Sequence, residues 1–134
     1  MKSHISHLVF GINPDNAAFY KDLMTFLGWH VLYEAPGMLG VADGGKTSIW
    51  FGARTKDVPN DYDGPGLNHI AIGVGSQADV DATVAYLQAR GVPALFETPR
   101  HRAEFSSGPS DTYYQVMFES PDRILVEVVY QGPK

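Results

Sequence analysis

Two stretches with the same alternation of polar and apolar residues begin the two halves of the chain. Residues 6–12 read Ser-His-Leu-Val-Phe-Gly-Ile, and residues 68–74 read Asn-His-Ile-Ala-Ile-Gly-Val. In each stretch a polar residue and a histidine precede an apolar run, and a glycine follows four residues after the histidine. Alternation of this kind is typical of β-strands. The match therefore predicts two strands related by an internal duplication.

A helical pattern follows each of these predicted strands. In the first half, apolar residues recur at helical spacing over 18–27, after turn-forming residues at 13–15. In the second half, Ser76 is a candidate N-cap with Asp79 three residues later, which predicts a helix start. Glycine after the last apolar position is typical of a helix end. These C-terminal glycines are Gly28 and Gly91.

Alternation and a high content of β-branched or aromatic residues predict the remaining strands. The fold class is then α+β, with two βαβββ modules forming a curved mixed sheet around a cleft and the helices outside. Module one covers about residues 1–55, a linker about 56–65, and module two about 66–134. The longest irregular stretch is predicted at 97–112. The further strands are predicted at 29–33, 38–42, 47–52, 92–96, 113–119 and 124–130.

The composition narrows the possible functions. The chain of 134 residues has 44% hydrophobic and 19% charged residues, which is typical of a soluble globular protein. It has no apolar run long enough for a membrane span and no pattern of a signal peptide, so we expect a cytoplasmic protein. The net charge of −5 disfavours nucleic acid as a partner. Because cysteine is absent, disulfides, thiolate zinc sites and cysteine nucleophiles are excluded.

Three residues form a candidate metal site. Side chains in a strand point alternately to its two faces, which places His7, His69 and Glu127 on the faces turned away from the helices. Glu127 lies in an otherwise apolar strand, where a carboxylate needs a cation or strong donors. Two imidazoles and one carboxylate match the facial triad that leaves coordination positions open for a substrate. The alternative is two structural histidines and a salt-bridged glutamate.

Four other residues are candidates for substrate binding, each with a structural alternative. Trp50 would stack on a planar substrate or pack in the fold. His101 would act as a general acid or base, and Arg102 would bind a substrate carboxylate, unless both are solvated loop residues. Tyr113 and Tyr114 point to opposite faces of one strand, so only one of them faces the cleft. We take Tyr114 as the substrate-binding residue.

Four motifs are spread over nearly the whole chain. They are Ser-His-Leu-Val at 6–9, Ala-Phe-Tyr-Lys-Asp-Leu at 18–23 leading to Leu-Gly-Trp at 27–29, Gly-Leu-Asn-His-Ile-Ala at 66–71, and the segment 113–127 ending in Glu. In these motifs the chain resembles the vicinal oxygen chelate superfamily, which includes glyoxalase I, extradiol dioxygenases, fosfomycin-resistance enzymes and bleomycin-resistance proteins. In the tail motif of the family, Ser120 and Arg123 replace the usual Asp and Gly of an Asp-Pro-Asp-Gly turn.

The resemblance implies a function and a site. His7, His69 and Glu127 match three of the family's metal-ligand positions, and Glu127 is also the candidate catalytic residue. The fourth position falls on Trp50, which cannot be a ligand, so a four-ligand glyoxalase I site is disfavoured. The implied protein is a homodimeric enzyme that uses Fe²⁺, Mn²⁺, Ni²⁺ or Zn²⁺ on a small molecule with vicinal oxygens, as a lyase, isomerase or dioxygenase. The alternative is a metal-free binding protein of the bleomycin-resistance kind.

Overall fold

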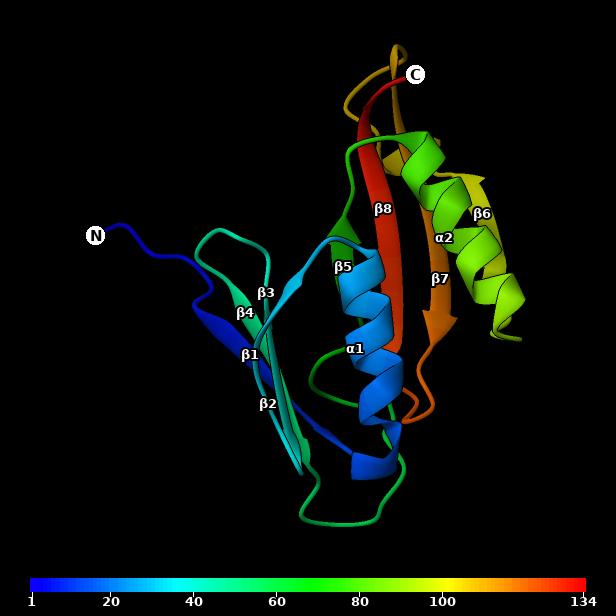
Figure 1. Cartoon of the computed structure of the whole chain (residues 1–134). Coiled ribbons are helices and arrows are strands. Elements are labelled where there is room, and N and C mark those ends of the chain that lie inside the picture. Colours follow the sequence, from blue (N-terminus) through cyan, green and yellow to red (C-terminus); the bar gives the residue numbers. More distant parts are fainter. The chain divides into compact units, whose positions relative to one another are not determined.

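The computed structural model describes all 134 residues and divides the chain into two compact units. Unit 1 is Met1–Pro59 and unit 2 is Asn60–Lys134. Each unit holds one four-stranded mixed sheet and one α-helix (Figure 1). The predicted α+β fold of two βαβββ modules is therefore confirmed.

The two units have the same topology. In both sheets the first strand pairs in parallel with the last, and the other pairings are antiparallel. The strand orders are β1-β4-β3-β2 and β5-β8-β7-β6. Unit 1 contains β1 His7–Ile12, η1 Pro14–Asn16, α1 Ala17–Phe26, β2 His30–Ala35, β3 Met38–Ala42 and β4 Ser48–Ala53. Unit 2 contains β5 Ile70–Gly73, α2 Gln77–Ala89, β6 Leu95–His101, η2 Ala103–Phe105, β7 Asp111–Glu119 and β8 Leu125–Pro133.

The helix ends follow the capping signals in the sequence. The Oγ atom of Ser76 accepts a hydrogen bond of 3.2 Å from the backbone N–H of Asp79, which satisfies an otherwise free donor at the start of α2. Gly28 and Gly91 follow the last residues of the two helices with φ angles of 91° and 69°. Residues with a side chain rarely adopt this left-handed conformation, so glycine ends each helix at a defined residue.

Alternate residues of the strands bury the helix-facing side of each sheet. In unit 1 the ring of Phe51 on β4 stacks on Phe10 of β1 at 5.7 Å and on Tyr20 of α1 at 4.4 Å. In unit 2, α2 lies against β7 and β8 (Figure 1). Its contact face carries Val80 and Leu87, both at most 1% exposed. The buried face of α2 thus packs on the sheet of unit 2.

The strand predicted at 92–96 is wrong in its bounds, because β6 runs over Leu95–His101. The predicted loop 97–112 therefore shortens to residues 102–110, which include η2. Phe96 and Glu97 have φ angles of 57° and 60°, and the pairing register shifts between Leu95 and Arg100. The Oγ1 atom of Thr98 accepts a hydrogen bond from the backbone N–H of Met117 on β7. A bulge thus carries the strand past Pro99, which cannot donate to the sheet.

Gly40 on β3 gives a test of packing in unit 1. A Cβ atom at this position would lie 2.6 Å from the Trp50 ring, so alanine must displace the indole. We expect Gly40→Ala to cost about 1–3 kcal/mol of stability and to change tryptophan fluorescence. The matched control is Gly73→Ala, because a Cβ atom there meets nothing within 4 Å. Equal urea midpoints for the two variants would contradict this packing.

Candidate functional site

The carboxylate of Glu127 is buried in the middle of β8. The residue is 2% exposed and lies between Val126 and Val128 in an otherwise apolar strand. Its Oε1 atom accepts a hydrogen bond of 2.5 Å from the Tyr113 hydroxyl, and its Oε2 atom lies 3.0 Å from Nε2 of His69. The Oε1 atom therefore has a hydrogen-bond donor, and the Oε2 atom faces an imidazole nitrogen that is a donor only when it carries a proton.

The imidazole of His69 is oriented from its other side. Its Nδ1 atom lies 2.7 Å from Oδ1 of Asn68, and the side-chain amide of Asn68 donates to the carbonyl of Tyr62 at 2.9 Å. Because Oδ1 of Asn68 can only accept, the proton of the neutral ring lies on Nδ1, and Nε2 then presents the lone pair that a metal ligand requires. The segment before β5 thus fixes the ring with Nε2 directed at Glu127.

These groups line a cavity of about 690 Å³ in unit 2. Tyr113, Gln115 and Met117 lie on the face of β7 that carries Glu127, because Met117 and Glu127 are paired across the sheet. Burial and then the hydrogen bond to Glu127 raise the pKa of Tyr113 above its usual range. Tyr113 is therefore protonated over the physiological range and acts as a hydrogen-bond donor to the carboxylate.

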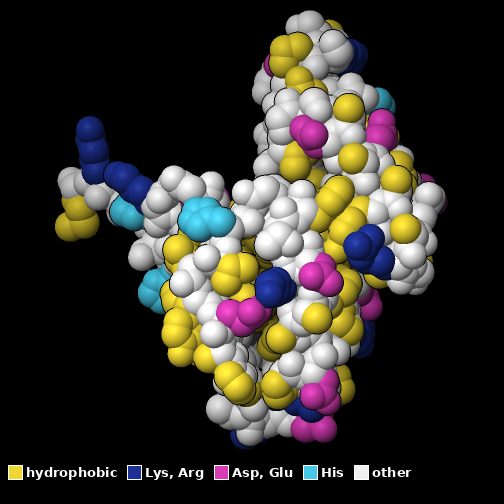
Figure 2. All heavy atoms as spheres, viewed as in Figure 1, with side chains coloured by type: hydrophobic (Ala, Val, Ile, Leu, Met, Phe, Trp, Pro, Cys, Tyr) yellow, Lys and Arg dark blue, Asp and Glu magenta, His cyan; other side chains and the backbone are white.

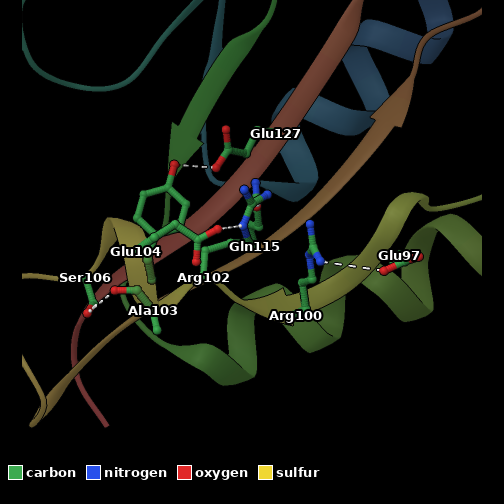
Figure 3. A network of polar contacts seen from close by, with 9 residues as sticks. Glu97, Arg100, Arg102, Ala103, Glu104, Ser106, Gln115 and Glu127 are labelled. Atoms are coloured by element: carbon green, nitrogen blue, oxygen red, sulfur yellow. Dashed lines mark hydrogen bonds and ion pairs between the residues drawn. The ribbon is translucent and has the colours of Figure 1, made fainter.

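Arg102, predicted as a substrate-binding residue, lines the same cavity. Its Nε atom donates to Oε1 of Glu104 at 2.6 Å, and its Nη1 atom donates to Oε1 of Gln115 at 3.4 Å. The guanidinium carbon lies 4.7 Å from the centre of the Phe105 ring. Figure 3 shows Arg102, Glu104, Gln115 and Glu127 grouped together, with Arg100 and Glu97 to one side. One fixed cation therefore lines the cavity that holds the buried carboxylate.

Tyr114 and His101, predicted as substrate-binding residues, do not line this cavity. The Tyr114 hydroxyl donates to Asp81 on α2 at 2.7 Å, which places Tyr114 on the helix-facing side. Burial, followed by this bond, raises its pKa to about 12. His101 pairs with Tyr114 across the sheet and hydrogen-bonds to Thr112. His101 lines a different cavity of about 670 Å³.

The residues predicted for the site in unit 1 lie on the face of its sheet away from α1. His7 is exposed at the start of β1, with Nδ1 3.5 Å from Oγ of Ser6. Trp50 lies on β4, where its indole N–H donates to Ser48 at 3.0 Å and its ring centre is 6.2 Å from that of Tyr33. Figure 2 shows hydrophobic side chains (yellow) on the surface of this unit. The exposed ones on its strands are Val9, Val31, Leu32, Tyr33 and Met38.

The two sheets place Trp50 and Glu127 at equivalent positions. Val9 lies two residues after His7 and pairs with Trp50, and Ala71 lies two residues after His69 and pairs with Glu127. The predicted correspondence between Trp50 and Glu127 is thus present in the register. Indole has no lone pair for a metal. Unit 1 therefore offers a histidine without the carboxylate that unit 2 has, and no three His, Asp or Glu side chains gather as a metal-binding group in the structure.

Three residues of the site were not predicted as such. Asn68 and Gln115 were given no role, and Tyr113 was passed over in favour of Tyr114. Tyr113 lies four residues before Met117 on β7, so the two side chains share one face of the strand. Met117 pairs with Glu127 on β8, and this pairing identifies Tyr113 as the tyrosine on the same face as Glu127. Asn68 precedes the histidine in the repeated motif, at the place of Ser6 in the first copy.

Comparisons with known proteins agree with this fold. Residues 4–128 match the model of the Glyoxalase/Bleomycin resistance protein/Dioxygenase superfamily. The uncharacterized protein YqjT of Bacillus subtilis (strain 168) is 42% identical over 64 residues, which is 48% of this chain and 46% of YqjT. The match thus spans about half the length of that curated relative.

Two solved structures show how far the similarity extends. A candidate glyoxalase from Bacillus halodurans is 29% identical, with a TM-score of 0.77 over 94% of each chain. A lactoylglutathione lyase from Agrobacterium tumefaciens is 18% identical, with a TM-score of 0.63 over 96% of this chain and 94% of that chain. The second similarity is one of fold only.

Proposed function

Because this chain belongs to the Glyoxalase/Bleomycin resistance protein/Dioxygenase superfamily, we propose that it is a metal-dependent enzyme acting on a small molecule with vicinal oxygens. In this proposal His7, His69 and Glu127 hold one divalent ion of Fe, Mn, Ni or Zn. The observation that carries the proposal is the buried Glu127 carboxylate with His69 Nε2 at 3.0 Å.

The chemistry of the donor atoms fits such an ion. Imidazole nitrogen and carboxylate oxygen are ligands for all four of these metals. His69 and Glu127 each present a donor atom to the same cavity, and each has a second group that holds it in place: Asn68 for the imidazole and Tyr113 for the carboxylate. Outer partners of this kind orient metal ligands in known sites.

The role of the chain's own residues follows from their positions. When bound, the metal would act as a Lewis acid that stabilises negative charge on the substrate oxygens. Tyr113 holds the carboxylate, Asn68 holds the imidazole, and Arg102 binds a part of the substrate away from the metal. Trp50 offers an aromatic surface for a planar substrate. Glu127 is the residue we propose as both ligand and catalytic group.

The position of Trp50 supports a site with three protein ligands. The first unit supplies His7, and the place equivalent to Glu127 carries an indole. A site with three protein ligands leaves positions for the substrate to chelate the metal. The proposed partners are thus a small molecule and, to close the exposed sheet edges, a second copy of the chain.

No helix in the structure is long and apolar enough to span a membrane, and we propose a cytoplasmic location.

The reaction class is tested in two steps, of which the first is to load the metal-free protein with each ion in the absence of oxygen. The loaded protein is then assayed: oxygen uptake with catechols in aerated buffer would identify a dioxygenase, and consumption of a hemithioacetal would identify a lyase or isomerase. We expect one of these activities to depend on one of the ions. Bleomycin binding by a protein that takes up none of the ions would contradict the proposal and favour the binding-protein alternative.

Tyr113 allows a sharper test with a matched control. Tyr113→Phe removes the donor to Glu127, and we expect metal affinity to fall about 10–100-fold, as for other outer partners of ligands. Tyr114→Phe makes the same chemical change on the other face of β7, where the hydroxyl donates to Asp81. We expect it to bind metal like the wild type. Equal affinities of the two variants, measured by calorimetric titration, would exclude this role of Tyr113.

A further inference from the structure

We propose that the substrate carries a carboxylate on an apolar or aromatic body, and that Arg102 binds this carboxylate in competition with the chain's own Glu104. The inference rests on the proposed function in taking the occupant of the cavity to be the substrate. It names the chemical class of that occupant.

Arg102 is the permanently charged cation of the cavity, and its charged partner in the structure is Glu104. No other arginine and no lysine lines this cavity, and His69 is engaged with Glu127. Two acidic residues line the cavity as well: Glu127, which contacts Tyr113 and His69, and Asp63. A neutral ligand offers the Arg102 guanidinium no charged partner in place of Glu104. A ligand with one negative group gives it a partner of the geometry that guanidinium binds best.

The contact with Glu104 shows that a carboxylate fits this guanidinium. Glu104 Oε1 accepts from Arg102 Nε at 2.6 Å, and the Glu104 side chain is 56% exposed while that of Arg102 is 23% exposed. The Glu104 backbone, and then Arg102, lower the pKa of this carboxyl, so it is charged at neutral pH. Because the Glu104 carboxylate is more than half exposed, water solvates it when it leaves Arg102, and this lowers the net strength of the pair. An incoming carboxylate can therefore displace Glu104 at low cost.

Exposed rings beside Arg102 indicate the rest of the ligand. Phe96 and Phe105 line the cavity and are 51% and 53% exposed. Large apolar side chains exposed at the wall of a cavity favour an apolar ligand group. Further inside, Met117 and Leu125 provide an apolar floor. The cavity thus combines one cation with apolar walls.

The test is calorimetric binding of 3-phenylpropanoate and of its neutral amide to the metal-free and to the metal-loaded protein. These two probes share the aromatic body and lack vicinal oxygens. We expect the acid to bind about tenfold more tightly than the amide, because a hydrogen-bonded charge contributes about this factor. Arg102→Gln should remove the preference, and Arg102→Lys, which keeps the charge, should retain part of it. Equal binding of acid and amide by the wild type would overturn the proposal.

Neighbouring residues supply the matched controls. Arg100 and Glu97 form a second pair, with 3.6 Å between Nη1 and Oε2, and Arg100 does not line the cavity. Arg100→Gln should therefore keep the preference for the acid. Glu104→Gln should strengthen acid binding by up to about fivefold, and Glu97→Gln should not. Weaker binding in Glu104→Gln than in Glu97→Gln would overturn the competition.

The two proposals fail separately in this design. A preference for the acid in the metal-free protein supports the Arg102 subsite even if no metal binds. Metal binding without any preference for the acid overturns the subsite and leaves the metal site standing.

Discussion

Replacing His69 with alanine is expected to lower the affinity for a divalent metal by more than about 100-fold, since loss of an outer partner alone costs about 10–100-fold. The imidazole is one of two donors that already lie together, with Nε2 3.0 Å from Oε2 of Glu127. Without it the carboxylate keeps only Tyr113 as a partner. Activity that depends on the metal should fall in parallel.

A second histidine variant tests whether removal of any exposed histidine lowers the affinity for metal. His30 is exposed on β2 of unit 1 and is not one of the residues that line the cavity of unit 2. His30→Ala should bind metal like the wild type in the same competition titration with a chelating dye. Unchanged affinity in His69→Ala, with circular dichroism like that of the wild type, would exclude His69 as a ligand.

Phe118→Ala is expected to destabilise unit 2 by about 3–5 kcal/mol. Phe118 on β7 is fully buried. When its ring is removed, the surrounding side chains fill only part of the cavity that is left, so the packing contacts are lost. Far-ultraviolet circular dichroism during urea denaturation measures this loss. Both tryptophans, Trp29 and Trp50, belong to unit 1, so their fluorescence follows the other unit during the same titration.

The control for this prediction is Phe26→Ala at the end of α1. Phe26 is 42% exposed, and we expect a cost of about 1 kcal/mol. A loss for Phe118→Ala no larger than that for Phe26→Ala would contradict the burial of Phe118 in the core of unit 2.

The repeated motif made most of the fold predictable. His7 is the first residue of β1 and His69 directly precedes β5, and each of these strands pairs in parallel with the last strand of its unit. Local signals were sufficient for the helix ends, because capping by Ser76 and the left-handed glycines depend on a few neighbouring residues. The burial of Glu127 could also be predicted, because apolar residues surround it in the sequence.

The misplaced features depend on contacts between segments far apart in the chain. The sequence predicts that the strand ends at residue 96, before Pro99. In the structure the Oγ1 atom of Thr98 accepts a hydrogen bond from the backbone N–H of Met117, and the bulge lets β6 continue to His101. The faces on which Tyr113 and Tyr114 lie depend on a contact of the same kind. Which of the two faces Glu127 depends on the register between β7 and β8, and a shift of one residue reverses it.

The metal content of the untagged protein, after reconstitution with each ion and dialysis, tests the central claim most directly. It is measured by elemental analysis beside the His7→Ala variant, because His7 is the proposed ligand from the other unit. We expect about one equivalent of a single transition metal in the wild type and a clear loss in the variant. No metal in the wild type with any ion, or equal metal in both proteins, would contradict a site built from His7, His69 and Glu127.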